Sequence, residues 1–332
     1  MNQPNSQTAN QPMNQPARPP TTLVTGVAGF IGAAVARRLM EEGNRVIGID
    51  SLHTGYRENV PDGVDFIEGD LRYGATLEPL KARHIDCIMH IAGQSGGEPS
   101  YDDPVFDLQA NAQSTLLLLL LARKTNCRRF IYASSVSVYG NQPEGEHGLD
   151  EDTCPAPQSI YGVGKLASEH YMRLYAQQFG LGCISLRLFN IYGAGQNLAN
   201  LRQGMISIYV SLALDNRHIQ VKGAGERYRD FVNIDDTVQA FLDARSSDLS
   251  GYNVFNVCSG VATTVTHVIE LLRASLPFDV TVEYSGSTPG DVHGWRGNPR
   301  RIRDATGWEA TKTLETGVRQ MVQWALNKRD LD

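Results

Sequence analysis

Three residues in the middle of the chain, Ser135, Tyr161 and Lys165, have side chains that together could remove a proton from a hydroxyl group. Tyr161 and Lys165 are four residues apart, so on a helix their side chains lie one above the other. A lysine ammonium beside a phenol favours the phenolate form. Free tyrosine has a pKa of about 10, and lowering it to about 7 takes roughly 4 kcal/mol of differential stabilisation. The pattern predicts Tyr161 as a general base, with Ser135 hydrogen-bonded to the same substrate hydroxyl.

Two other interpretations of these residues have to be weighed. A Tyr-x-x-x-Lys pair with nothing around it is usually an exposed pair on a helix surface. A serine hydrolase would need a histidine and an acid placed by a motif around Ser135, and the sequence offers no such motif. The segments that precede Ser135 decide in favour of the general base, because they predict a site for a hydride acceptor.

The first of these segments is Thr25-Gly-Val-Ala-Gly-Phe-Ile-Gly32, which follows an apolar run and precedes a helical pattern. Gly26 allows a tight turn, Gly29 allows close approach to phosphate oxygens, and Gly32 lets the helix pack on the strand. Free N–H groups at the helix start would then face a pyrophosphate. The spacing is G-x-x-G-x-x-G, which alone would also suit an ordinary strand-to-helix turn. Here it predicts a dinucleotide site.

An acid at the end of the second apolar run strengthens this interpretation. Val46-Ile-Gly-Ile49 ends in Asp50, which could bind both hydroxyls of an adenosine ribose or could simply be a solvated strand end. A carboxylate there would repel a 2′-phosphate, so we expect NAD rather than NADP. The positive charge of an oxidised nicotinamide would then help Lys165 to lower the pKa of Tyr161.

Strands and helices alternate through about residue 190, which predicts an α/β fold with a doubly wound, Rossmann-type parallel sheet. Right-handed crossovers place the ends of the strands along one edge, where Asp70 and Ala92 would join the glycine turn. Asp70 could meet an adenine amino group or, equally well, cap a helix. Strands are expected at 21–24, 46–49, 64–68, 85–91, 129–133 and 183–188, with long helices at 103–124 and 159–178.

We expect three parts: a disordered tail at 1–20, a Rossmann domain at 21–190, and a smaller α/β substrate lobe at 191–332. Some segments of the third part could return to the Rossmann domain. The tail carries Asn-Gln-Pro three times and little that is apolar, so it is not a signal peptide. In the last part we expect helices at 203–215, 235–246, 264–274 and 312–327, and short strands at 219–221, 229–233, 253–257 and 280–284.

Composition limits the function classes. The 332 residues carry a formal net charge of −6 without a basic run, which argues against nucleic-acid binding. Five scattered cysteines indicate neither disulfides nor a metal site and suit a reducing cytoplasm. Six leucines at 116–121 are too few to span a membrane. One face of the helix at 103–124 is expected to meet a second subunit, together with the helix at 159–178, in a homodimer.

The chain resembles the extended short-chain dehydrogenase/reductase family, in its NAD-dependent epimerase/dehydratase branch and nearest to the UDP-glucose 4-epimerase-like subgroup. The motifs that carry the resemblance are the glycine turn, Asp50, Gly69-Asp-Leu71, Ser134-Ser135 with Val138-Tyr-Gly140, Tyr161-x-x-x-Lys165, Leu186-Arg-Leu-Phe-Asn-Ile-Tyr-Gly193, Arg229-Asp-Phe231 and Pro289-Gly-Asp291.

The resemblance implies a reaction and further site residues. Tyr161 would take the proton of a sugar 4-hydroxyl while NAD takes hydride from C4, and hydride would return to the other face of a 4-keto sugar. Asn190 and Trp295 would border the sugar, Arg229 the diphosphate and Asp291 the nucleoside ribose. The implied cofactor-binding residues are Gly26, Gly29, Phe30, Ile31, Gly32, Asp50, Asp70, Leu71, Ala92, Asn111, Tyr161 and Lys165.

Several positions distinguish this chain from relatives. Sugar 4,6-dehydratases carry Asp-Glu where Val136-Ser137 stand here, and related decarboxylases a nearby glutamate, so both reactions are disfavoured. A reductase that releases NAD(P)H, or a non-catalytic NAD sensor, remains an alternative. Thr288 replaces an arginine that usually holds the diphosphate; Arg296, Arg300 or Arg301 could compensate. Ser114 replaces a glycine that usually follows Asn111. Trp295 is large, which favours an unacetylated hexose.

Overall fold

The computed structural model describes residues 18–286 and 292–329. Most of the expected tail at 1–20, and the positions Thr288 and Asp291, lie outside the described residues.

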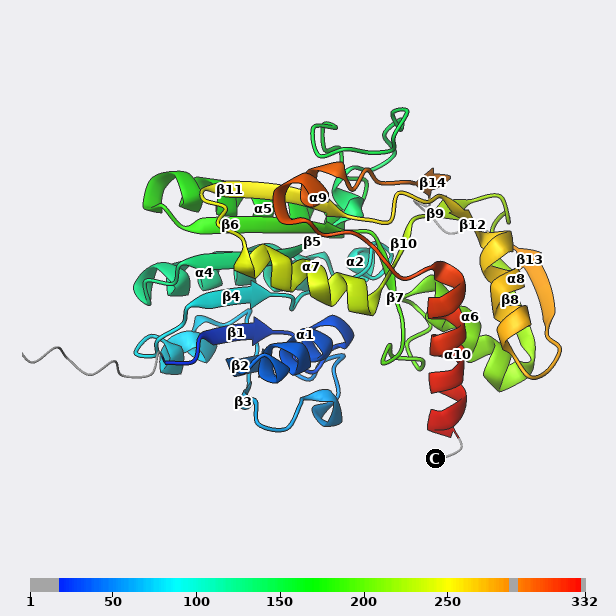
Figure 1. Cartoon of the computed structure of the whole chain (residues 1–332), viewed down its shortest axis with the longest axis horizontal. Coiled ribbons are helices and arrows are strands. Elements are labelled where there is room, and N and C mark those ends of the chain that lie inside the picture. Colours follow the sequence, from blue (N-terminus) through cyan, green and yellow to red (C-terminus); the bar gives the residue numbers. More distant parts are fainter. Residues whose placement is uncertain (1–17, 287–291, 330–332) are drawn as a thin grey trace, which may run out of the picture.

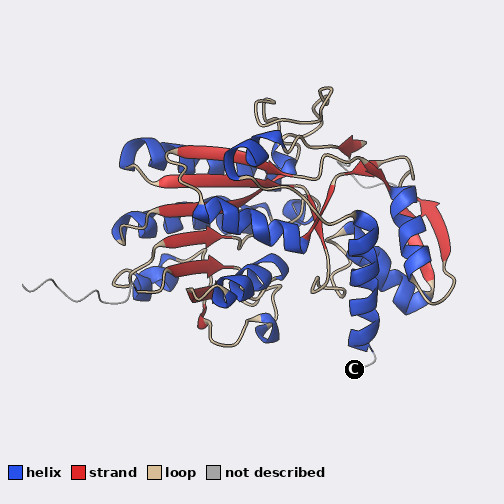
Figure 2. Ribbon diagram, viewed as in Figure 1, coloured by secondary structure: helices blue, strands red, loops and turns tan. Residues whose placement is uncertain are grey.

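A parallel sheet of seven strands forms the centre of the larger part of the molecule, which confirms the predicted α/β fold class (Figures 1 and 2). Its strand order is β11-β6-β5-β4-β1-β2-β3, so the chain starts in the middle and winds outward in both directions. The strands are β1 (Thr21–Thr25), β2 (Arg45–Asp50), β3 (Asp65–Glu68), β4 (Cys87–His90), β5 (Arg129–Ser135), β6 (Gly182–Leu188) and β11 (Tyr252–Val257).

Helices cover both faces of this sheet, since successive side chains of a strand point to opposite faces. Val24 packs with the helices of one face, and its neighbour Leu23 packs with those of the other face. The first face carries α1 (Phe30–Glu41), α7 (Ile234–Ser246) and α9 (Arg300–Thr306), and the second carries α4 (Ser114–Lys124) and α5 (Ile160–Phe179). Short turns connect the rest: η1 (Arg57–Asn59), η2 (Gly74–Leu80), α2 (Pro99–Asp102) and η4 (Val136–Val138).

The helix predicted at 103–124 differs from the structure in one respect, because it is not continuous. A π-type turn, η3 (Gln109–Gln113), separates α3 (Pro104–Leu108) from α4. Hydroxyl groups compete for the carbonyls of this turn: Ser114 donates to the Ala110 carbonyl at 2.7 Å and Thr115 to the Asn111 carbonyl at 2.7 Å. The wider turn carries Asn111, which is fully buried. Such turns are frequent at functional sites.

The same run, Pro104–Lys124, is long and apolar enough to cross a membrane by length and composition alone. Half of its apolar window is buried inside the fold, where α4 packs against α5. A core helix of this kind passes the same test, so the run is weak evidence for a membrane span.

A smaller group of elements lies beyond the end of the sheet (Figure 1). Its core joins α6 (Met205–Asn216), α8 (Val265–Ser275) and α10 (Leu314–Arg329) with the parallel pair β8 (His218–Lys222) and β13 (Thr281–Ser285). A three-stranded sheet of β12 (Thr263–Thr264), β9 (Tyr228–Arg229) and β14 (Gly294–Trp295) and the pair β7 (Asn190–Tyr192) with β10 (Phe231–Asn233) complete it.

Three segments beyond residue 190 belong to the larger sheet rather than to the smaller group. β11 pairs with β6, α7 packs across α1 and β5, and α9 packs on β11. Trp308, which follows α9, is 1% exposed within the same core and donates its Nε1–H to the Asp236 carbonyl. The boundary between residues 190 and 191 therefore stays a prediction. Segments from both sides of it contribute to the larger sheet and its covering helices.

Candidate active site

The glycine turn after β1 brings backbone against backbone. Gly26 has a φ of +72°, and a Cβ on it would lie 2.9 Å from the Ala92 nitrogen. A Cβ on Gly32 would lie 2.0 Å from the Gly26 carbonyl oxygen. A side chain is therefore excluded at both positions, and α1 begins directly behind the turn.

The start of α1 opens into a large cavity at the edge of the sheet. No side chain caps the helix at Gly29, so its first N–H groups remain free to hold an anion. The cavity has a volume of about 820 Å³. Residues predicted to bind the cofactor line it: Gly26, Gly29, Phe30, Ile31, Gly32, Asp50, Asp70, Leu71 and Ala92. This combination fits the pyrophosphate and adenosine part of a dinucleotide.

Two acids lie in the cavity wall with different partners. Asp50 accepts backbone N–H groups of Ala28 at 2.9 Å and of Leu52 at 2.8 Å, which fixes its orientation and leaves lone pairs for ribose hydroxyls. Asp70 pairs with Arg72 at 2.6 Å. Burial opposes ionisation, but the hydrogen bonds from Arg72 hold the pKa of Asp70 below its usual value. Asp70 does not cap a helix, because η2 begins at Gly74.

Ser135, Tyr161 and Lys165 come together behind this cavity. Ser159 caps α5 by accepting the Gly162 N–H at 3.1 Å, which places Tyr161 in the first turn and Lys165 one turn later. The Lys165 Nζ donates to the Ala133 carbonyl at 2.9 Å and lies 5.6 Å from the centre of the Tyr161 ring. The Ser135 hydroxyl, at the end of β5, lies near enough to the Tyr161 phenol to lower its pKa.

The three residues do not themselves line the cavity, and Gly93 connects the two regions. A Cβ on Gly93 would lie 3.4 Å from the Lys165 Nζ and 2.5 Å from the Asn111 Oδ1. Gly93 lines the cavity, so Lys165 and Asn111 lie directly behind its wall. A dinucleotide that continues past Gly93 would therefore reach Lys165.

Burial shifts both titrating groups away from the charged forms. It raises the pKa of Tyr161 to about 12, against the hydrogen bond from Ser135. It lowers the pKa of Lys165 to about 8, against the opposite charge of Asp107. A pKa near 7 for Tyr161 would thus need about 7 kcal/mol from bound charge, more than the roughly 4 kcal/mol expected from sequence. The protein alone keeps the phenol protonated.

Asn190 and Arg229, which are predicted to bind the substrate, contact other residues of the same chain. The Asn190 Nδ2 donates to the Asp230 carbonyl at 3.1 Å. Arg229 is 5% exposed and its guanidinium lies 5.4 Å from the centre of the Trp295 ring. Burial lowers the pKa of Arg229 to about 10. Trp295 donates its indole N–H to the Gly140 carbonyl at 2.9 Å, so its ring is fixed.

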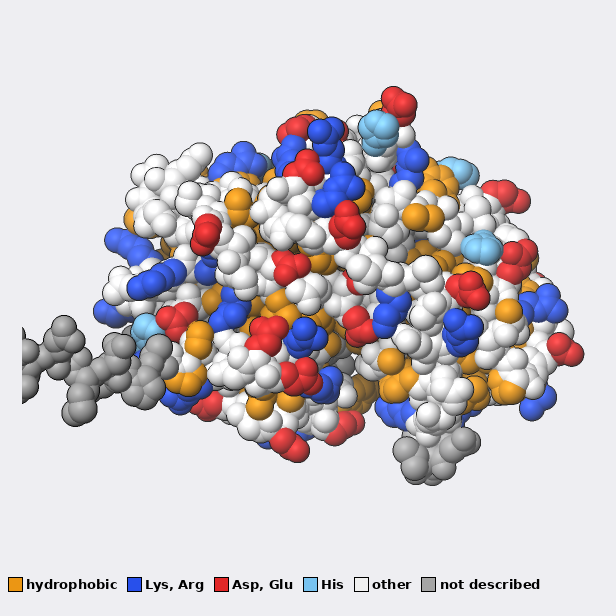
Figure 3. Space-filling model, viewed as in Figure 1, with side chains coloured by type: hydrophobic (Ala, Val, Ile, Leu, Met, Phe, Trp, Pro, Cys, Tyr) orange, Lys and Arg blue, Asp and Glu red, His pale blue; other side chains and the backbone are white. Residues whose placement is uncertain are grey.

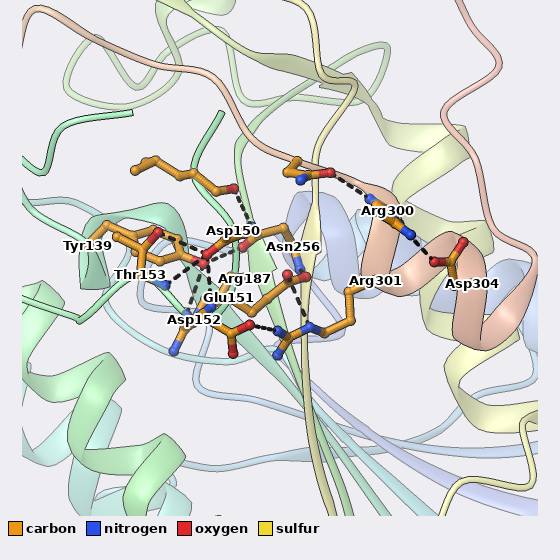
Figure 4. A network of polar contacts seen from close by, with 12 residues as sticks. Tyr139, Asp150, Glu151, Asp152, Thr153, Arg187, Asn256, Arg300, Arg301 and Asp304 are labelled. Carbon is orange, nitrogen blue, oxygen red and sulfur yellow. Dashed lines mark hydrogen bonds and ion pairs between the residues drawn. The ribbon is translucent and has the colours of Figure 1, made fainter. Parts of the chain in front are cut away.

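The three arginines proposed as substitutes for position 288 are engaged with acids or carbonyls. Arg296 contacts Glu144 and donates to the Glu146 carbonyl at 2.9 Å. Arg300 pairs with Asp304, and Arg301 with Glu151 and Asp152 (Figure 4). The ion pairs of these two α9 residues lie in the polar network of Figure 4. The expectation that Arg300 or Arg301 holds the diphosphate is therefore not supported by their contacts.

That network fixes the segment after Ser135. The Tyr139 hydroxyl donates to the Asn256 Oδ1 at 2.7 Å and accepts from Arg187 at 2.9 Å. The Asn256 backbone N–H donates to Glu151 at 2.7 Å. Loop 139–152, β6, β11 and α9 thereby meet in one set of contacts (Figure 4).

Sequence reasoning missed three buried polar residues of this region. His90 contacts the Thr25 hydroxyl at 2.9 Å, and burial and Lys165 lower its pKa. The Tyr132 ring lies 4.8 Å from the Lys165 Nζ. Asp107 accepts from the Asn111 Nδ2 at 3.1 Å. Of the three, only Asp107 could have been found from the sequence, because it lies one helical turn before Asn111.

Known proteins share the sequence and the fold. A family model described as "NAD dependent epimerase/dehydratase family" matches residues 22–258. A UDP-glucose 4-epimerase of Mycolicibacterium smegmatis is 32% identical over 314 residues, which cover 92% of this chain and 99% of that protein.

Two solved structures are similar along most of their length. One is a UDP-glucose 4-epimerase of Thermotoga maritima with UDP-glucose (TM-score 0.89, 30% identity, 94% of this chain and 100% of that chain). The other is a UDP-glucose 4-epimerase of Thermus thermophilus with NAD (TM-score 0.85, 31% identity, 92% of this chain and 98% of that chain). Together with the glycine turn and the arrangement of Ser135, Tyr161 and Lys165, these similarities lead to one assignment: the chain belongs to the NAD dependent epimerase/dehydratase family.

Proposed function

We propose that this protein is a nucleotide-sugar 4-epimerase of the UDP-glucose/UDP-galactose type. The observation that carries the proposal is the arrangement of Tyr161 and Lys165 on the first turns of α5, with Ser135 near enough to lower the pKa of the phenol. The similarity to UDP-glucose 4-epimerases over more than nine-tenths of the chain supports the same activity.

In this proposal the residues act on the sugar 4-hydroxyl. Tyr161 accepts its proton, Ser135 orients the hydroxyl, and Tyr161 returns the proton after the sugar has turned. NAD, when bound in the cavity beside Gly93, supplies a reversible hydride acceptor and a positive charge. Lys165 holds its ammonium next to the Tyr161 ring, so the phenolate forms only when both positive charges are present. The burial of Lys165 keeps water away from this exchange.

A 4,6-dehydratase needs acids to eliminate water, and the segment after Ser135 lacks them. Val136 is buried, and the Ser137 hydroxyl is 3.2 Å from that of Ser135. A reductase with exchangeable NAD would use the same three residues, so it remains the second candidate. For the sugar, the fixed Trp295 ring beside Arg229 favours an unacetylated hexose.

The decisive experiment is incubation of the purified protein with UDP-galactose, without added cofactor, and chromatography for UDP-glucose. Conversion supports an epimerase that retains NAD through its cycle. Bound NAD without conversion would contradict this substrate and direct the search to other nucleotide sugars. If the protein shows no conversion and contains no bound NAD, the result contradicts the proposal and favours the reductase.

We also propose a cytoplasmic homodimer. Apolar side chains are exposed on adjacent helices, with Leu120 of α4 at 49%, and Val163 and Leu174 of α5 at 55% and 53%. The five cysteines are all free, in keeping with a reducing compartment. Sedimentation should report a dimer, and Leu174→Glu should shift it toward monomer. Val261→Glu, at an exposed apolar residue of another surface, should not.

A further inference from the structure

Asp107 is a buried acid that the proposed mechanism does not use. It lies on α3, one turn before Asn111, and is 0% exposed. Its Oδ2 accepts the Asn111 amide at 3.1 Å, whereas its Oδ1 has no hydrogen-bond partner among the described residues. An unpartnered carboxylate oxygen in the interior is unfavourable unless another charge compensates it.

The compensating charge is on the catalytic helix. A Cβ on Gly164 would lie 3.3 Å from the Asp107 Oδ1 and 3.2 Å from the Cβ of Asn111. Gly164 precedes Lys165, so its missing side chain lets α3 and the following turn pack against α5 at the lysine. Asn111 extends the contact on its other side, since a Cβ on Gly93 would touch both the Asn111 Oδ1 and the Lys165 Nζ.

The other titratable groups around this pair are either uncharged or paired elsewhere. Glu169, one turn further along α5, is bound by both arms of Arg187. His90 of β4 has a lowered pKa because of burial and Lys165. Tyr132 of β5 and Tyr161 of α5 have raised pKa values because of burial. Asn111 carries no charge, and Asp102 of α2 pairs outward with Arg202. Within the described residues, Asp107 and Lys165 are thus the opposite charges that act on each other here, across the contact at Gly164.

We propose that Asp107 is a positioning residue that acts through Lys165, as its buried counter-ion, and sets the pH range in which Tyr161 serves as base. This inference rests on the proposed function. The arrangement also raises the pKa of Tyr161 through charge repulsion, which Lys165 and bound positive charge must overcome.

The direct test is Asp107→Asn, which removes the charge and keeps the shape. Both limbs of the pH profile of kcat/KM should move to lower pH by about 1 unit, because Lys165 loses support for its ammonium and Tyr161 loses a repelling charge. Asp243→Asn is the matched control. Burial also raises the pKa of Asp243, but this residue lies on α7 at the opposite face of the sheet, and its variant should leave both limbs in place.

A second readout needs no activity. Burial raises the pKa of Asp107 in the fold, against Lys165, so the ionised carboxylate disfavours folding once the pH exceeds its unfolded pKa. Asp107→Asn should therefore raise Tm at pH 8 and have little effect near pH 4. In a Lys165→Met background the gain at pH 8 should be larger, because the carboxylate there lacks its partner.

The outcomes separate the two proposals. The counter-ion proposal would be overturned if Asp107→Asn lowered Tm at every pH. It would also be overturned if the Tm gain at pH 8 were the same with and without Lys165. Wild type without sugar conversion would contradict the proposed function, yet the Tm cycle would still decide on Asp107. If Asp107→Asn does not fold, Lys165→Met alone serves: its Tm should fall relative to wild type as pH rises from 4 to 8, and a constant difference would refute the pair.

Discussion

Two buried acid–base pairs meet on one face of α5, and they differ in how completely they are hydrogen-bonded. Glu169 receives both arms of Arg187 at 3.0 and 2.8 Å, and the Ser134 hydroxyl at 2.6 Å. One turn earlier, Lys165 makes one hydrogen bond and faces Asp107, which keeps an unpartnered oxygen.

The difference separates a structural from a functional pair. Burial alone would lower the pKa of Arg187, but Glu169 holds it above the usual value, so this guanidinium never loses its charge. Lys165, with fewer partners, has its pKa lowered to about 8 by burial. Incomplete satisfaction thus keeps the second pair able to titrate and to bind further groups.

The largest expected effect comes from Tyr161→Phe, which removes the proton acceptor beside the unsatisfied pair. Activity should fall by about 10²–10⁴-fold, because general base catalysis contributes that much. Tm should stay near the wild-type value, since the Glu169 pair is intact. Turnover equal to wild type would disprove the assignment of Tyr161.

Arg187→Met tests the satisfied pair in the opposite sense. It leaves the Glu169 carboxylate buried without its cation, so the free energy of unfolding should fall by about 3–5 kcal/mol. Urea denaturation measures this loss. Lys165→Met is the matched change at the other pair, and it should abolish activity with a much smaller loss of stability. Equal stability losses from Arg187→Met and Lys165→Met would contradict the division into a structural and a functional pair.

A pH titration of the wild-type protein sharpens the comparison without a mutation. Turnover should decline as pH rises through about 8, where Lys165 loses its charge. A lysine whose folded pKa is lowered favours the fold more as pH rises through that value, so its deprotonation should not itself lower stability. Circular dichroism should therefore stay constant where turnover drops. A parallel loss of both signals would argue against Lys165 as the cause.

The smallest effect is expected at Ser159, the N-cap residue of α5, the helix that carries both Lys165 and Glu169. Ser159→Ala removes the side chain that accepts the Gly162 N–H and should reduce stability by about 1 kcal/mol. Because Tyr161 lies in the first turn, turnover should fall more than the unfolding midpoint suggests. Ser159→Asp, which can still cap, serves as the control that retains both properties.

Local patterns were enough to predict the sheet and the glycine turn. Gly26 and Gly32 have fixed spacing to a strand and a helix, and α1, which lies between β1 and β2, follows ordinary helical periodicity. The π-type turn at Asn111 was not predictable, because hydroxyls of Ser114 and Thr115 displace the regular hydrogen bonds. The Arg187 network was missed because Tyr139, Asn256 and Glu151 meet only in the folded chain.

The surface follows composition more simply. Acidic and basic side chains are intermixed over the face in Figure 3, without a broad area of one sign. This mixing agrees with the small net charge of −6 and offers no extended electrostatic attraction for a polyanion on that face.

The position of β11 at the edge of the sheet has a consequence for synthesis. The ribosome must release residues 252–257 before β6 gains its outer neighbour, and Trp308 before the core beneath α7 closes. The sheet that carries the glycine turn therefore cannot mature while the nascent chain ends near residue 190. A fragment stopped there would present β6 as a bare, apolar edge, prone to pair with other chains.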